Sequence, residues 1–287
     1  MQSSVPRRAD RLLVLTARAA ALISAAVLLF MLLFLAREAL PALRSPGVGA
    51  FLTDRAWHPT EGEYGMLPMA AGTLLAMAGA LLLAIPLGVL SALFCCFYAP
   101  APLAGIYRSL LGLLAGIPSV VFGFWGLVTL VPLLNQVQPP GASLLAAALI
   151  LALMVLPTLA LTAEAGLRAV PREYLAAAAA LGLSRPTTIY RVALPAARSS
   201  LATAVVLAAG RALGETMAVL MVAGNVVQVP RSLFDPVRTL TANIALEMAY
   251  ATSAHRSALF VSGLALALLV GALVLAAETL SRRPARG

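Results

Sequence analysis

An arginine and a glutamate, Arg211 and Glu215, stand four residues apart inside a long apolar segment of this sequence. Residues at this spacing share one face of an α-helix, so the two side chains are predicted to pair. A charge at the middle of a bilayer costs roughly 3 kcal/mol on insertion scales, which favours a functional site. The alternative is a structural ion pair that joins two helices. Gly210 and Gly214 flank the arginine and permit a neighbouring helix to approach closely.

The pair belongs to one of six apolar segments that reach spanning length, which is about 20 helical residues. Of the 287 residues, 61% are hydrophobic and 11% are charged, a composition outside the range of soluble domains. The sequence therefore predicts an all-α integral membrane protein with six transmembrane helices. Kinks are expected in the longer segments, with Pro86, Pro118 and Pro132 as candidate sites. The six segments lie near residues 15–36, 67–98, 104–134, 143–165, 199–223 and 257–280.

The arginines predict how the chain is oriented, because all 20 basic residues are arginines and they cluster at the ends of the apolar segments. With the N-terminus inside, thirteen fall in inner segments, six in outer loops and Arg211 within a span. This excess predicts that both termini and the loop of residues 166–198 are cytoplasmic. It also favours a topology signal over nucleic-acid binding. The arginine-rich start resembles a signal peptide, but its apolar run is long enough to be an uncleaved first span.

The polar segment of residues 168–195 reads as helix, stop, helix. Pro171 suits the first turn of a helix, and Gly182 suits a left-handed C-cap. Ser184 can cap a second helix, which Pro195 ends. Neither helix is long or apolar enough to span a bilayer, so both are expected at its surface, where a partner can bind.

The spacing of this segment resembles the EAA loop of bacterial ABC-importer permeases. That family's pattern is E-A-A, three residues, G, nine residues, I-x-L-P. Here Ala176 replaces the glutamate and Val192 the isoleucine, while Glu173 lies three residues upstream. The alternative is an ordinary connector of two amphipathic helices. The resemblance implies that the loop couples the permease to an ATPase through Glu173, Ala176, Ala177, Ala178, Gly182, Leu194 and Pro195.

Further stretches resemble the PstC-type permeases of phosphate-specific ABC importers over most of residues 64–260. They are YGMLPMAAGTLL, IPLGVLSALF, GIPSVVFGFWGL, RALGETMAVLMVAGN and RTLTANIALEM. The continuation of Gly-Glu-Thr as Met-Ala-Val-Leu favours PstC over its paralogue PstA, which usually continues with Ala-Pro-Leu. The resemblance implies the type I ABC-importer permease fold in a bacterial inner membrane.

The same resemblance implies partners and a division of labour. A PstA-like permease would complete a heterodimeric pore, with a PstB-like ATPase dimer on the cytoplasmic side and a PstS-like phosphate-binding protein in the periplasm. No cofactor is expected in this chain, and ATP with magnesium would bind the ATPase. The chain has no lysine and hence no Walker A motif. It is therefore expected to be a non-catalytic transport subunit.

The candidate substrate pathway consists of Arg211, Glu215, Thr216 and Asn225. Arg211 is the candidate to stabilise a transiting anion, and Glu215 would orient it and moderate its charge. Other readings remain open. They are a PstA-type subunit, a permease for sulfate or molybdate, an ATP-independent secondary phosphate transporter, and a scaffold or sensor arm of a phosphate-signalling complex.

The remaining polar residues are assigned no chemistry. In the first outer loop, Trp57 and Tyr64 are expected to anchor the chain at the membrane interface and His58 to be solvated. In the second, the ALEMAY stretch is expected to form a short re-entrant or surface helix. Glu164 is expected to be interfacial.

No metal site is predicted, because the adjacent Cys95 and Cys96 have no second pair and are expected to pack as small apolar residues. The expected division of the chain follows the spans. It comprises a cytoplasmic tail (1–14), the first span with its outer loop (15–66), the permease core (67–280) and a C-terminal tail (281–287).

Overall fold

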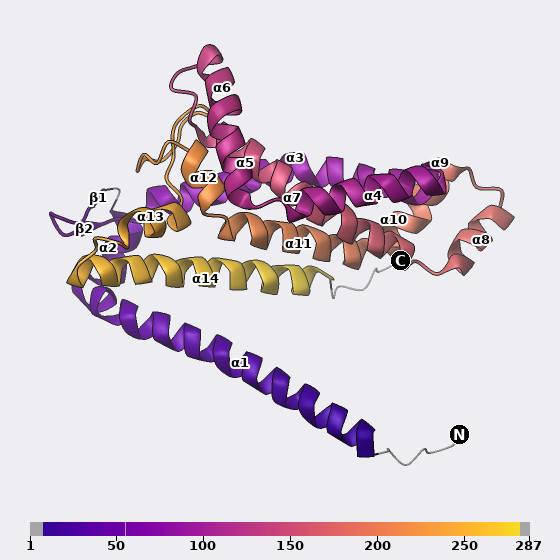
Figure 1. Ribbon diagram of the computed structural model, residues 1–287, viewed down its shortest axis with the longest axis horizontal. Helices are drawn as coiled ribbons and strands as arrows, with labels where there is room; N and C mark the ends of the chain where they lie inside the picture. Colours follow the sequence, from indigo (N-terminus) through magenta and orange to yellow (C-terminus); the bar gives the residue numbers. More distant parts are fainter. Residues whose placement is uncertain (1–7, 55, 282–287) are drawn as a thin grey trace.

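The computed structural model describes residues 8–54 and 56–281, and most of these are helical. Most of the long helices run side by side along the long axis, while α1 diverges from this bundle (Figure 1). The helices long enough to span a membrane, or to form part of a span, are α1 (Arg8–Ala42), α3 (Leu67–Leu93), α4 (Ala101–Gly116), α5 (Ser119–Trp125), α6 (Val131–Val137), α7 (Leu144–Arg168), α11 (Arg198–Gly214), α12 (Met217–Val222) and α14 (Ser253–Ser281). The shorter elements are α2 (Val48–Thr53), β1 (Trp57–His58), β2 (Glu63–Tyr64), α8 (Arg172–Ala180), α9 (Arg185–Thr188), α10 (Leu194–Ala196) and α13 (Leu240–Glu247).

The core is the contact between α3 and α7. Alanines at four-residue intervals, Ala76, Ala80 and Ala84, form a buried stripe along α3. This stripe continues as Gly88, where an added Cβ would collide with the side chain of Leu159 on α7. Small residues at this spacing let two helix backbones approach closely, which is a common way to pack helices in membranes. The central part of α7 is buried on most sides as a result.

The predicted third span is interrupted. The α4 helix ends at Gly116, and Ile117 and Pro118 are extended, with ψ of 128° and 140°. A residue before proline is disfavoured in the helical region, so Pro118 separates α4 from α5. The sixteen-residue α4 is too short to be a full span, and the run Ser119–Val137 takes that place. Pro86, by contrast, lies inside the continuous α3.

The predicted fifth span also differs from one continuous helix. The helix α11 ends at Gly214, and α12 begins only at Met217. At its other end, α11 meets the helical run Arg185–Ala196 at an angle of 70°. The described residues contain five helices long and apolar enough to cross a membrane, or six if this bent pair counts as one. The expected all-helical membrane architecture is therefore present.

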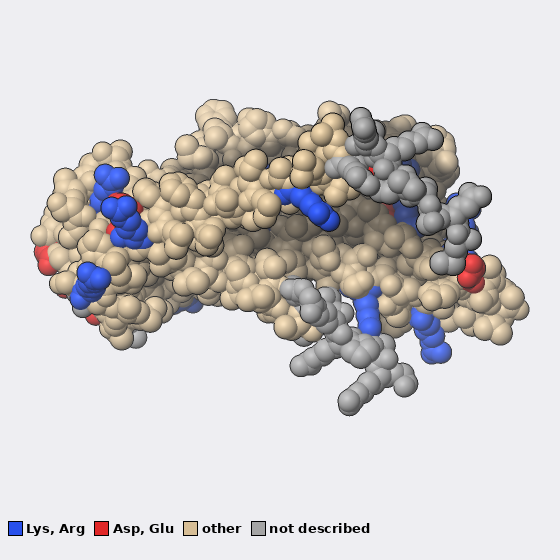
Figure 2. All heavy atoms as spheres, turned by 90° about the horizontal axis from the view of Figure 1, so that it is seen from below, with Lys and Arg blue, Asp and Glu red and all other residues tan. Residues whose placement is uncertain are grey.

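The surface matches this architecture. Figure 2 shows the charged side chains of one face gathered mainly towards the two ends of the long axis, with a broad uncharged band between them. A basic side chain interrupts this band near its middle. Large apolar side chains are exposed along α1 and α3, among them Leu22, Phe30, Leu82 and Leu90. Such surfaces suit lipid or a partner subunit.

A separate cluster of buried apolar side chains lies at the end of the bundle that carries the β-hairpin. Trp57 pairs with Tyr64 across the hairpin, and the two rings meet edge to face at 5.7 Å. Both are buried, at 6% and 5% exposure, against α2, α13 and α14. The prediction that they anchor the chain at the membrane interface is wrong, because their rings face the protein interior.

Candidate functional site

Arg211 lies in the last turn of α11, thirteen residues and roughly 20 Å from the start of that helix. Its side chain is exposed. The negative end of the helix dipole stabilises a cation at this position. Directly after it, Gly214 ends the helix, and Glu215 is extended, with ψ of 130°.

The predicted ion pair between Arg211 and Glu215 is not formed among the described residues. The reason is the break, since Glu215 no longer belongs to the helix that carries Arg211. One carboxylate oxygen of Glu215 instead accepts a hydrogen bond from the backbone N–H of Ala218 at 3.3 Å, which caps the first turn of α12. Arg211 therefore presents a positive charge that this carboxylate does not neutralise.

Thr216 and Asn225 occupy the two ends of α12. The Thr216 hydroxyl donates to the Gly214 carbonyl at 3.3 Å and so stays at the break beside Glu215. Asn225 lies beyond the far end of the six-residue helix, in the left-handed region with φ of 55°. Its amide nitrogen donates to the carbonyl of Leu220 at 2.7 Å. The structure thus groups Thr216 with the break and gives Asn225 a role in ending α12.

The polar loop has the predicted form of two helices separated by a glycine. Gly182 follows α8 with φ of +68°, which glycine adopts without strain. Its N–H donates to Ala179 O at 3.0 Å, and Leu183 N–H donates to Ala178 O at 3.1 Å. These two bonds define a Schellman C-cap, so the predicted role of Gly182 is confirmed.

The second half of the loop differs in detail. Ser184 occupies the N-cap position, but its hydroxyl bonds to that of Thr187 at 2.9 Å and caps no backbone N–H. The helix then continues through a π-helical turn, Ile189–Ala193, and ends one residue after Pro195. A proline has no N–H for the helix, which agrees with irregular hydrogen bonding just before it.

The loop projects from the end of the bundle opposite the hairpin (Figure 1). Glu173, Ala176 and Ala177 are exposed on α8, while Ala178 is buried against the rest of the loop. The large side chains of Leu181 and Tyr190 are also exposed, at 78% and 77%. Exposed apolar side chains of this kind on a projecting loop suit contact with a protein partner.

Glu164, which was predicted to be interfacial, lies near the end of α7 and is buried in the protein, at 3% exposure. Its Oε1 lies 3.1 Å from Arg108 Nε on α4 and 2.8 Å from Arg168 Nε on α7. The nearby cysteines have no disulfide, and Cys95 is buried, as expected for small apolar residues.

A second buried carboxylate, Glu247, lies at the hairpin end and was not predicted. Its Oε1 accepts from Arg238 Nη1 at 2.7 Å. Its Oε2 accepts from Trp57 Nε1 at 2.7 Å and lies 2.8 Å from His255 Nε2. These three partners come from three separate parts of the chain, so no local sequence pattern could indicate them. Figure 1 shows α13, which carries Glu247, next to the hairpin and α14.

Comparison with known proteins identifies the family. The profile of the binding-protein-dependent transport system inner membrane component matches residues 84–285. The chain belongs to this family. It is 38% identical over 273 residues to the probable ABC transporter permease YqgH of Bacillus subtilis, covering 92% of this chain and 88% of that one. It is 34% identical over 266 residues to the phosphate transport system permease PstC of Xylella fastidiosa, covering 85% and 82%.

A solved structure supports the same fold. The chain resembles a bacterial alginate ABC transporter, crystallised with an alginate-bound periplasmic protein, with a TM-score of 0.62 and 17% identity over 93% of this chain and 96% of that one. The type I ABC-importer permease fold is therefore confirmed. The chain is a multi-pass permease subunit of the transport family, a non-catalytic component.

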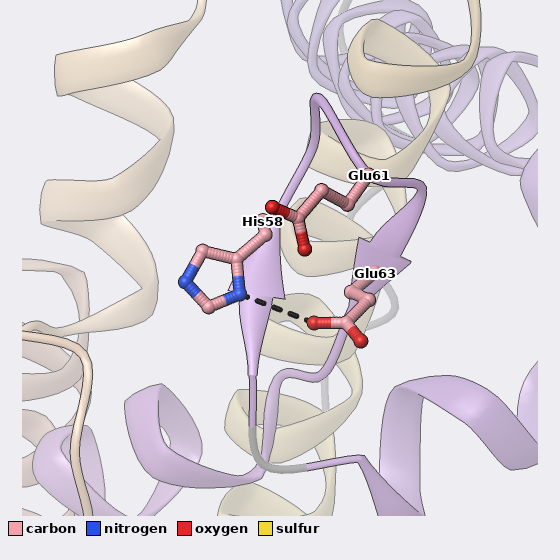
Figure 3. A group of neighbouring side chains, drawn as sticks. All are labelled: His58, Glu61 and Glu63. Carbon is pink, nitrogen blue, oxygen red and sulfur yellow. Dashed lines mark hydrogen bonds and ion pairs between the residues drawn. The ribbon is translucent and has the colours of Figure 1, made fainter.

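The permease also carries a group of possible metal ligands on its hairpin. Figure 3 shows His58, Glu61 and Glu63 side by side, with their ligand atoms within 4.8 Å of one another. His58 Nδ1 lies 3.1 Å from Glu63 Oε2. All three side chains are exposed, and proximity of exposed carboxylates alone does not make a metal site. We assign none here.

Proposed function

We propose that this permease is the PstC-like subunit of an ATP-driven importer that moves inorganic phosphate into the cytoplasm. The observation that carries the proposal is the exposed Arg211 at the helix break. Relatives that cover most of this chain are named as phosphate transport permeases, which supports phosphate as the substrate.

Arg211 suits a transient anion site. A guanidinium offers five N–H donors in a planar fork that matches the oxygens of phosphate. Its charge is stabilised by the C-terminal end of α11 and is not shared with Glu215. We infer that Glu215 acts by shaping the break and does not moderate the arginine's charge. Thr216 follows Glu215 in the chain and contributes a second polar side chain to the helix break.

Inward transport of phosphate requires energy. Moving one elementary charge through 100 mV is worth about 2.3 kcal/mol, so an inside-negative potential opposes a mono- or divalent anion by roughly 2 to 5 kcal/mol. In our proposal a PstB-like ATPase dimer supplies this energy, with ATP and magnesium bound to it and no cofactor in this chain. The exposed α8 surface around Glu173, Ala176 and Ala177 is its docking site.

We assign the other two partners to different surfaces of the bundle. A PstA-like permease completes the pore on the side of Arg211, and a PstS-like binding protein docks at the hairpin end. The arginine distribution supports an orientation in the inner membrane with both termini and the α8 loop in the cytoplasm.

The test is transport by the reconstituted complex. This chain is co-expressed with its PstA-, PstB- and PstS-like partners, and uptake of radiolabelled phosphate into vesicles is measured. We expect uptake that requires ATP and the binding protein, with sulfate and molybdate failing to compete. Uptake by this chain alone without ATP would overturn the proposal, and competition by sulfate or molybdate would change its substrate.

A further inference from the structure

The buried carboxylate of Glu247 connects the hairpin to α13 and α14. Glu247 is 7% exposed and ends α13. Its two oxygens take three partners, which lie on the hairpin (Trp57), on the loop before α13 (Arg238) and on α14 (His255). Each hydrogen bond to a charged group inside a protein is worth more than one at the surface. The position of this end of α13 is therefore fixed by three separate elements.

The other end of α13 holds the helix break. The Thr241 hydroxyl donates to the backbone carbonyl of Glu215 at 2.8 Å. Thr239 caps the helix by accepting from the N–H of Ala242 at 3.2 Å. Thr241 and Glu247 are six residues apart, which is roughly 9 Å along a rigid helix. The helix α13 therefore joins Glu247 to the backbone of Glu215, which lies four residues from Arg211.

The hairpin can receive such a shift from outside. Its side chains alternate, so that Trp57 and Tyr64 are buried while His58 and Glu63 are exposed. A protein that docks on the exposed face would contact the same hairpin whose strand β1 carries the Trp57 indole. The indole N–H bonds directly to Glu247 at 2.7 Å.

We propose that Glu247 is a positioning residue that couples the hairpin, through α13 and Thr241, to the helix break beside Arg211. The inference rests on the proposed function, because it assigns the hairpin as the place where docking of the binding protein is sensed. Glu247 itself need not touch the substrate. Its role is to make the geometry at Glu215 depend on the position of Trp57.

The experiment uses the reconstituted complex and measures ATP turnover as the binding protein is titrated. Trp57→Phe removes the indole N–H but keeps an aromatic ring, and Thr241→Val removes the hydroxyl at nearly constant volume. Thr241→Ser keeps the hydroxyl and is the matched control. Thermal unfolding of each purified complex reports whether the fold is intact.

We expect the maximal stimulated turnover to fall roughly threefold with Thr241→Val and roughly tenfold with Trp57→Phe, as for a neutral and a charge-assisted hydrogen bond. The half-saturating concentration of binding protein should stay unchanged, and Thr241→Ser should restore turnover. Normal turnover in both variants would overturn the inference. A change confined to the half-saturating concentration of binding protein would also overturn it. The same holds for a loss of turnover that parallels a loss of thermal stability and that Thr241→Ser does not restore. A wild-type complex without stimulation would instead refute the proposed function, and the inference with it.

Discussion

Replacing Gly182 by proline should strongly reduce transport by destroying the C-cap of α8. Gly182 has φ of +68° and donates its N–H to Ala179 O at 3.0 Å. Proline fixes φ near −65° and has no N–H, at a cost of about 3 kcal/mol or more. Alanine keeps the N–H but disfavours the left-handed region by roughly 1 to 2 kcal/mol. Because α8 has nine residues and buries only Ala178, little else holds its end in place.

These energies predict how far each substitution lowers the population of the loop conformation that binds the ATPase. At 1.4 kcal/mol per factor of ten, Gly182→Pro should reduce ATP-dependent phosphate uptake about 100-fold, and Gly182→Ala about 5- to 30-fold. The matched control is Gly112→Ala in α4, where an added Cβ meets no atom within 4 Å. Its uptake should equal that of the wild type. Uptake by Gly182→Pro within threefold of the control would refute the role of this cap.

Two further predictions concern buried hydrogen bonds. Glu164→Gln removes the charge that two arginines share, and should lower the free energy of unfolding by about 1 to 3 kcal/mol, less than for a fully buried pair since the arginine side chains are 40% and 51% exposed. An unchanged melting temperature of the purified complex would contradict this. Thr73→Val leaves the Leu240 N–H, which donates to the threonine hydroxyl at 3.0 Å, without an acceptor, and should cost about 1 to 3 kcal/mol. Thr73→Ser should recover most of that loss in the same thermal scan, and equal losses for both variants would rule out the hydrogen bond as the cause.

The loop could be predicted from its sequence because its signals are local. A glycine after an alanine run determines the cap at Gly182 from its own backbone freedom, whatever the rest of the fold does. Pro118 likewise breaks its span through a clash with the residue before it. Such features depend on neighbours in the chain, so their positions are correct within one or two residues.

The break after Arg211 is a harder case. Hydropathy detects only that residues 199–223 are apolar, and both a continuous and a broken helix satisfy it. The run Gly214, Glu215, Thr216 does contain the signal, since glycine weakens a helix and the polar side chains compete for its backbone bonds. The four-residue spacing of Arg211 and Glu215 favoured the wrong interpretation.

The buried carboxylate at the hairpin end could not be predicted from one sequence. Trp57 and Glu247 are 190 residues apart, and nothing near either residue indicates the other. Trp57 is an aromatic residue in a loop between two apolar segments, and such residues are typical of the membrane interface, so the sequence favours an interfacial anchor over a buried side chain. Tertiary packing decides such contacts.

The measurement that tests the central claim most directly is phosphate uptake by the reconstituted complex with Arg211→Gln. Glutamine keeps hydrogen-bond donors but removes the charge, and a charge-assisted contact worth about 1.5 to 3 kcal/mol predicts uptake 10- to 100-fold below the wild type. Arg37→Gln, which removes an exposed arginine from α1, is the matched control and should leave uptake unchanged. Wild-type uptake by Arg211→Gln would contradict the account, because the exposed guanidinium at the helix break would then play no part in moving the anion.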